Sequence, residues 1–144
     1  MRAVLAGLFL GVALFAGQRS QPKVYKIYVA EMHFPKNPDL DEFVRSKLIS
    51  YLAQFCGPTC TVIDGAGSSG DDVAEKADGV LTGVVQIQET DQMRYRVQGA
   101  MRLVDKDGNV LWAATVYNSP FVRSATSSFA ANTAKKLTTF LSRQ

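Results

Sequence analysis

Two strand-like runs joined by a short turn constrain the fold of this chain more than any other feature. Residues 93–105 (MRYRVQGAMRLVD) alternate between polar and apolar side chains, and the polar set is Arg94, Arg96, Gln98 and Arg102. A period of two is typical of a β-strand, and residues 109–117 (NVLWAATVY) have strand-forming composition. Asp107-Gly108 between them is a strong hairpin signal. The pattern predicts an antiparallel hairpin.

The remaining segments extend this hairpin into an α+β domain. Strands are expected over 24–33, 59–63 and 78–89, the last in a central position because its first half is apolar on both faces. A helix is expected from a cap at Asp39 to Gly57-Pro58, with one apolar face. That face comprises Leu40, Phe43, Val44, Leu48, Tyr51, Leu52 and Phe55.

A short helix is expected from Asp71 to Ala77, and a terminal helix over 126–142. The element order is then β-α-β-(short α)-β-β-β-α. It predicts a single mixed sheet of about five strands with two long helices packed on one face.

The amino terminus differs in kind from the rest. Met1-Arg2 precedes the apolar run AVLAGLFLGVALFAG, which has the length of a signal-peptide core and is short for a bilayer span. We expect residues 1–20 to be a signal peptide and 23–144 a single soluble domain, periplasmic or secreted, without a membrane span after cleavage. An uncleaved membrane anchor is the alternative. No Cys near the cleavage region offers a lipid-anchor site.

The two cysteines, Cys56 and Cys60, stand in CGPTC between a helix and a strand. In an oxidising compartment, such a pair is expected to form a structural disulfide. Redox activity is the alternative, but redox dithiols sit at a helix amino terminus, where the dipole lowers the thiol pKa. Free thiols are the third possibility.

The net charge of +3, with scattered basic residues, does not favour nucleic acid as a partner. Gly65, Gly67 and Gly70 spell G-x-G-x-x-G, the dinucleotide-binding fingerprint. The helix after them is too short, and it begins with Asp71 and Asp72 where phosphates would bind. A surface loop and no cofactor are therefore expected, with a ligand-binding module using Gly65–Gly70 as an alternative.

Other chemical motifs are equally sparse. DKDGN has calcium-loop oxygens at Asp105, Asp107 and Asn109 but strands on both sides, so a turn and no metal site are expected. His33 is the only histidine, and no G-x-S-x-G elbow accompanies it. A small secreted hydrolase using His33 is kept as an alternative, but no catalytic residue is predicted and the chain is not expected to be an enzyme.

A partner surface is expected near the end of the last strand. Its candidate residues are Trp112, Tyr117, Phe121 and Val122. Exposed apolar patches mark protein interaction sites. The alternative for Trp112 is an ordinary place in the core.

Two stretches carry a resemblance to known envelope proteins. ADGVLTGVVQI (77–87) and YRVQGAMRLVDKDGNVLWAATV (95–116) resemble a pattern in the curli-secretion lipoprotein family, the amino-terminal domain of the Tol translocation protein TolB, and the lipoprotein activators of penicillin-binding proteins. The resemblance implies a periplasmic α+β module that assembles with or regulates other proteins. It implies an exported envelope accessory protein without catalytic activity, whose envelope protein partner and oligomeric state the sequence does not name.

Overall fold

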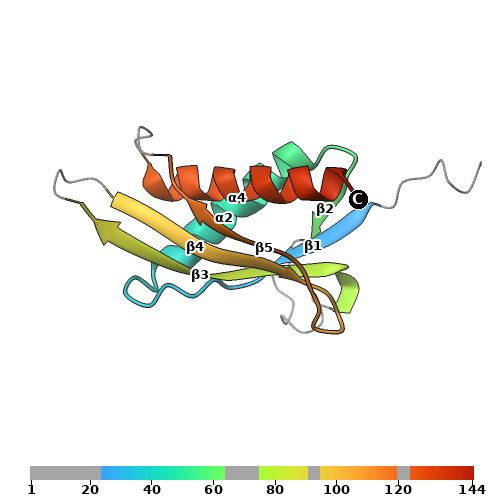
Figure 1. Cartoon of the computed structure of the whole chain (residues 1–144), viewed down its shortest axis with the longest axis horizontal. Helices are drawn as coiled ribbons and strands as arrows, with labels where there is room; N and C mark the ends of the chain where they lie inside the picture. Colours follow the sequence, from blue (N-terminus) through green and yellow to red (C-terminus); the bar gives the residue numbers. More distant parts are fainter. Residues whose placement is uncertain (1–23, 64–74, 91–94, 120–123) are drawn as a thin grey trace, which may run out of the picture.

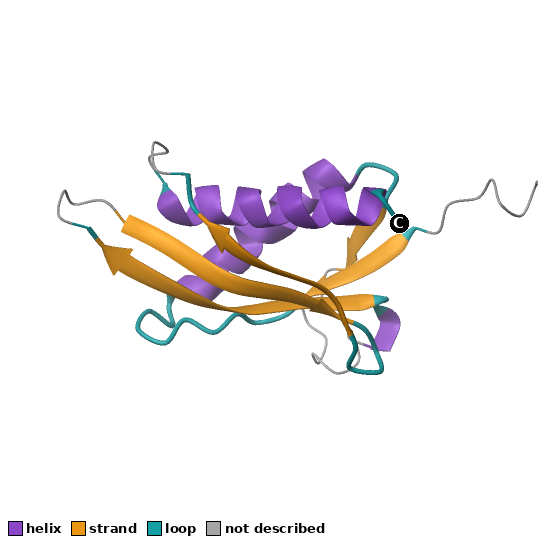
Figure 2. Ribbon diagram, viewed as in Figure 1, coloured by secondary structure: helices purple, strands orange, loops and turns teal. Residues whose placement is uncertain are grey.

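The chain forms one five-stranded sheet with two long helices on one of its faces (Figures 1 and 2). The computed structural model describes residues 24–63, 75–90, 95–119 and 124–144. The strands are β1 (Tyr25–Val29), β2 (Cys60–Ile63), β3 (Gly79–Glu89), β4 (Tyr95–Val104) and β5 (Val110–Tyr117), and the helices are α2 (Leu40–Cys56) and α4 (Ala125–Ser142). This α+β architecture confirms the predicted fold class.

The sheet is mixed, with strand order β2-β1-β3-β4-β5. β1 pairs in parallel with both β2 and β3, whereas β3, β4 and β5 form an antiparallel meander. A parallel β1–β2 pair needs a crossover, and α2 provides it. The central place expected for residues 78–89 is confirmed, because β3 lies in the middle of the sheet.

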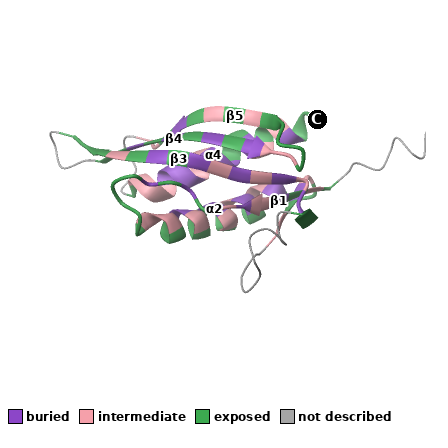
Figure 3. Cartoon of the chain, turned by 90° about the horizontal axis from the view of Figure 1, so that it is seen from below, coloured by how far each residue is buried: buried purple, intermediate pink, exposed green. Residues whose placement is uncertain are grey.

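The core lies between the helices and the sheet, and in Figure 3 the buried positions recur along the strands. Side chains of one parity on each strand meet the helices, as a period of two requires. Phe129 of α4 is 0% exposed and packs on β4 at Gly99, where a Cβ atom would lie 2.5 Å from the Phe129 ring. An aromatic ring thus occupies space that only glycine leaves free.

The first long helix differs from its prediction at two residues. Asp39 makes no side-chain capping hydrogen bond. Asp41 instead accepts a hydrogen bond from the Met32 backbone N–H at 2.7 Å. Phe43 is 44% exposed, so its expected place on the apolar face is wrong. The fully buried stripe is Val44, Leu48, Leu52 and Cys56. A spacing of four keeps that stripe on the core, and Phe43 falls about 100° around the helix from Val44.

The expected strand 24–33 ends earlier, at Val29, although the backbone beyond it still follows β3. The His33 N–H donates to the Gly83 carbonyl at 2.9 Å, and the Val85 N–H donates to the His33 carbonyl at 2.8 Å. This isolated parallel bridge holds Glu31 and His33 beside the central strand. Met32 between them is buried, so both flanking side chains point away from the core.

The DKDGN turn forms the predicted hairpin between β4 and β5. Asp105 Oδ1 accepts the backbone N–H groups of Asp107 and Asn109, both at 2.9 Å. These hydrogen bonds, chiefly those from Asn109, lower the pKa of the Asp105 carboxyl below its usual value. Gly108 has φ +84°, a left-handed conformation that favours glycine. The carboxylate that resembled a calcium ligand is therefore a backbone acceptor inside the turn.

Cys56 and Cys60 form the expected disulfide, with Cα atoms 4.9 Å apart. It links the end of α2 to the start of β2, and both residues are buried. Gly57, directly after the first cysteine, turns the chain with φ +52°. The bond therefore fixes the angle at which the chain leaves the helix and enters the sheet.

Removal of this disulfide is expected to lower the free energy of unfolding by about 2 kcal/mol, the chain-entropy value for a five-residue loop. Urea unfolding with and without a thiol reductant measures the loss. The control is the Cys56→Ala/Cys60→Ala variant, whose unfolding midpoint should not respond to the reductant. Equal stability of the oxidised and reduced wild-type protein would contradict the prediction.

Several sequence predictions lie outside the described residues. They are the signal peptide over 1–20, the glycine loop Gly65–Gly70, most of the short helix from Asp71, and the surface residues Phe121 and Val122. Within the described parts of the chain, neither helix is long and apolar enough to cross a membrane.

Candidate interaction surface

The face of the sheet opposite the helices carries a continuous set of outward side chains, which we call the open face. Cross-strand pairing arranges them in rows, of which two cross the middle of the meander. One row is Thr82, Arg102 and Ala113, and the other is Val84, Ala100 and Thr115. Figure 3 views the chain from below, so that this face of the sheet is turned toward the viewer. The outward side chains of β3, β4 and β5 thus form one shared surface.

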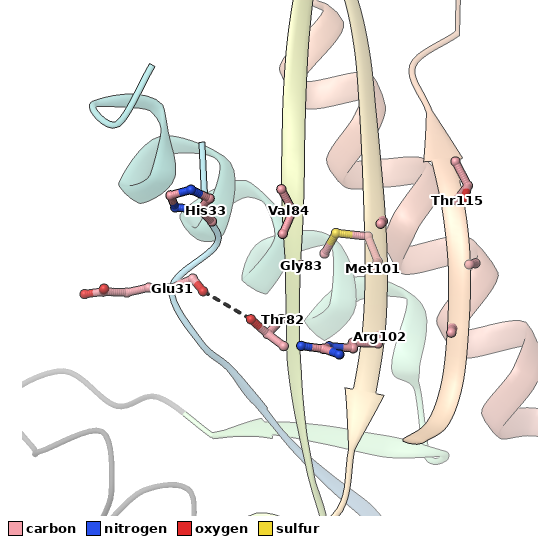
Figure 4. A pocket seen from close by; sticks show the side chains of 11 residues that line it. Glu31, His33, Thr82, Gly83, Val84, Met101, Arg102 and Thr115 are labelled. Carbon is pink, nitrogen blue, oxygen red and sulfur yellow. Dashed lines mark hydrogen bonds between the residues drawn. The ribbon is translucent and has the colours of Figure 1, made fainter. Parts of the chain in front are cut away.

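A hollow of about 610 Å³ lies on this face (Figure 4). Its floor is made of short side chains, which leave space above the strands. They are Thr82, Val84, Ala100, Ala113 and Thr115. Val84 is 46% exposed although it is apolar. The apolar content expected on both faces of residues 78–89 is therefore buried on the helix side only.

Charged and polar groups border the hollow on one side. Thr82 Oγ1 donates a hydrogen bond to the Glu31 carbonyl at 3.3 Å, which ties the segment after β1 to the sheet. Figure 4 shows the Arg102 side chain running toward Thr82, its partner across the strands. Glu31 and His33 point outward from the same border. The hollow therefore has a floor of methyl and hydroxyl groups with the Arg102 cation beside it, whereas the Glu31 side chain runs from its border away from the sheet (Figure 4).

The alternative of a hydrolase using His33 gains no geometric support here. Among the described residues that line the hollow, the hydroxyl groups are those of Thr82 and Thr115, and Thr82 Oγ1 donates to the Glu31 carbonyl and not to the exposed His33 ring. Nucleophilic catalysis needs a nucleophile within hydrogen-bond reach of its base. No three His, Cys, Asp or Glu side chains in the described ranges are grouped so as to hold a metal ion.

The candidate surface residues of β5 do not share a face. Trp112 pairs with buried Leu103 and packs on the core from the helix side. Tyr117 is 43% exposed on the opposite side, with the Arg96 guanidinium carbon 5.3 Å from its ring centroid. The Tyr117 carbonyl accepts a hydrogen bond from Asn132 of α4 at 2.8 Å. Trp112 and Tyr117 are therefore not one patch, and only Tyr117 belongs to the open face.

No protein-family model matches the sequence, and no curated protein matches it. Among solved structures, a single-residue variant of the PelC dodecamer from Paraburkholderia phytofirmans has a TM-score of 0.61 and 24% identity, and the match covers 84% of this chain and 91% of that one. A second PelC dodecamer structure from the same organism gives 0.58 and 23%, with 80% and 87% covered. The chain shares its fold with PelC.

A more distant match is a putative neuraminyllactose-binding hemagglutinin homolog from Helicobacter pylori, at a TM-score of 0.42 and 12% identity, with 86% and 94% covered. The PelC matches correct the resemblance to the curli-secretion, TolB and penicillin-binding-protein activator groups, which is wrong. Strand patterns such as 77–87 and 95–116 report sheet geometry that unrelated α+β families share, so they cannot select the family.

Sequence reasoning missed the hollow itself. The alternation over residues 93–105 correctly placed Arg96, Gln98 and Arg102 on one face of the strand. The shape of the hollow could not be predicted from the alternation. Ala100 and Ala113 carry no signal in the sequence, and they come close together only because β4 and β5 pair. The exposure of Val84 could not be predicted either, because an apolar run is typical of a strand that is buried on both faces.

Proposed function

We propose that the protein is an exported, non-enzymatic accessory module of the cell envelope that assembles with further copies of itself. The observation that carries this proposal is the asymmetry of the sheet. One face is buried under α2 and α4, whereas the other presents the hollow and the exposed Val84. Apolar exposure rimmed by polar groups is typical of protein interaction sites.

Two further observations support the proposal. The Cys56–Cys60 disulfide is compatible with an oxidising compartment outside the cytoplasm. The PelC structures that share this fold are described as dodecamers. A self-assembling subunit needs surfaces beyond those buried in its own core, and the open face is such a surface.

A recognition role and not a catalytic one is proposed for the open face because of the groups that it carries. Its hollow has a floor of methyl and hydroxyl groups, and Arg102, Glu31 and His33 stand at its border. Shape and charge of this kind suit recognition of another surface, whereas acid–base or nucleophilic catalysis needs paired reactive groups at hydrogen-bond distance.

Self-assembly is tested on the full chain expressed with its own amino-terminal segment and recovered from the envelope fraction. Multi-angle light scattering across a hundredfold range of concentration is expected to give a mass at least twice that of one processed chain, which is below the 15.7 kDa of the full sequence. Intact mass spectrometry of the same sample is expected to show that about the first twenty residues are missing. The mass should also be lower by two hydrogen atoms, which are lost when one disulfide forms. A monomer at every concentration would contradict the proposal.

A further inference from the structure

We infer that the outer surface of α2 in one copy docks into the hollow on the open face of the next copy. The inference rests on the proposed self-assembly and names the two surfaces that would meet.

Phe43 is the protruding ring. It is 44% exposed on the side of α2 that faces away from the sheet, together with Glu42, Ser46, Lys47 and Ser50. The serines are short, so the aromatic ring stands above its surroundings. Lys47 Nζ lies over the ring at 5.7 Å from its centroid, and a long lysine side chain can keep its charge in water when the ring is covered by a partner. Aromatic side chains that fill a partner's recess dominate the energetics of many interfaces.

The hollow offers the matching recess. Its floor of Ala100, Ala113 and Thr115 is low, whereas the bordering side chains are long. Its volume of about 610 Å³ exceeds that of one aromatic side chain, so parts of the adjacent helical turns fit as well. Docking would remove Phe43 and Val84 from water, one exposed apolar side chain from each surface.

The acidic amino-terminal end of α2 is complementary in charge to the arginines of the open face, whereas Lys47 beside Phe43 adds one positive charge to the same helix surface. Arg96 and Arg102 project from the open face, and the amino-terminal end of α2 carries exposed Asp39 and Glu42. Complementary charge steers association and fixes the register of a docked surface. The other helix does not fit this requirement, because the outer side of α4 is basic. Its exposed charges are Lys135, Lys136 and Arg143.

A contact between α2 of one copy and the sheet of the next uses two different surfaces. Such heterologous contacts propagate head to tail and produce a closed ring or an open filament. One copy therefore needs both an intact ring at Phe43 and an open hollow at Ala113 to sit inside an assembly. A copy that lacks one of them can still terminate a chain.

This consequence defines the test, performed with the full chain. Phe43→Asp removes the protruding ring and leaves the hollow, whereas Ala113→Trp fills the hollow and leaves the ring. Each variant alone is expected to be monomeric at concentrations where the wild-type protein assembles, with the self-association constant weakened by about thirtyfold or more, as for an interface hot spot. An equimolar mixture of the two is expected to form a one-to-one dimer, because the Phe43 ring of the Ala113→Trp variant can dock into the intact hollow of the Phe43→Asp variant.

Lys135→Glu on the outer side of α4 is the control, and it should assemble like the wild-type protein. If Ala113→Trp does not fold, judged by urea unfolding, the charge pair replaces it. Glu42→Arg and Arg102→Glu should each weaken assembly, and the double variant should restore it. A wild-type protein that assembles while Phe43→Asp and either sheet variant assemble equally well would overturn the inference and leave self-assembly intact. A monomeric wild-type protein would overturn both.

Discussion

Replacement of Phe129 by alanine is expected to lower the free energy of unfolding by about 3–5 kcal/mol, the usual cost of removing a buried phenylalanine ring. The ring is 0% exposed and joins α4 to the middle of β4. Because the glycine beneath it has no side chain that can move into the space, a cavity would remain. Urea unfolding monitored by far-UV circular dichroism measures the loss.

The matched control for this substitution is Phe140→Ala in the same helix. Phe140 is only partly buried, so its removal should cost about 1–2 kcal/mol, in proportion to the smaller apolar area that it buries. Equal losses for the two variants would show that Phe129 is not the ring on which the helix–sheet contact depends.

Replacement of Gly99 by valine is expected to destabilise the fold by about 3 kcal/mol, the upper part of the range for overpacked cores. A Cβ atom at this position would lie 2.5 Å from Cζ and 2.7 Å from Cε2 of Phe129. Valine has higher strand propensity than glycine, but that gain is at most about 1 kcal/mol, so the steric clash dominates. Urea unfolding again provides the measurement.

Gln98→Val on the same strand is the control, since residue 98 is exposed on the open face and valine is tolerated there. Gly99→Val combined with Phe129→Ala should be less destabilised than the sum of the single variants, because the smaller side chain frees the space that valine needs. Simple additivity of the two changes would contradict the close contact between the two residues.

The sequence predicted the elements of this fold well, because periodicity is a local property. The hairpin turn at Asp107-Gly108 and the terminal helix followed from short-range signals. The same period of two could have separated Trp112 from Tyr117, since an odd spacing along a strand places side chains on opposite faces. Phe43 was misplaced because an apolar residue near the edge of a helical stripe can fall on either side.

The parts that sequence could not provide are those that depend on pairing between distant segments. Gly99 lies under Phe129 only because α4 crosses β4 at that point. The hollow exists only because Ala100 and Ala113 lie on neighbouring strands whose outer face neither α2 nor α4 covers. Neither the Gly99–Phe129 contact nor the hollow produces a pattern in a single sequence, whereas a half-buried strand produces a polar–apolar alternation.

The most direct test of self-assembly through the open face is a crosslink between the two surfaces that are proposed to meet. Ser46→Cys, which lies beside Phe43 on the outer side of α2, and Ala113→Cys are introduced together, and a short bis-maleimide is added. Cys56 and Cys60 do not react, because they are bonded to each other. A ladder of covalent oligomers is expected on a denaturing gel, and Lys136→Cys in place of Ser46→Cys should give none. Monomer alone from the first pair, or equal ladders from both pairs, would contradict the account.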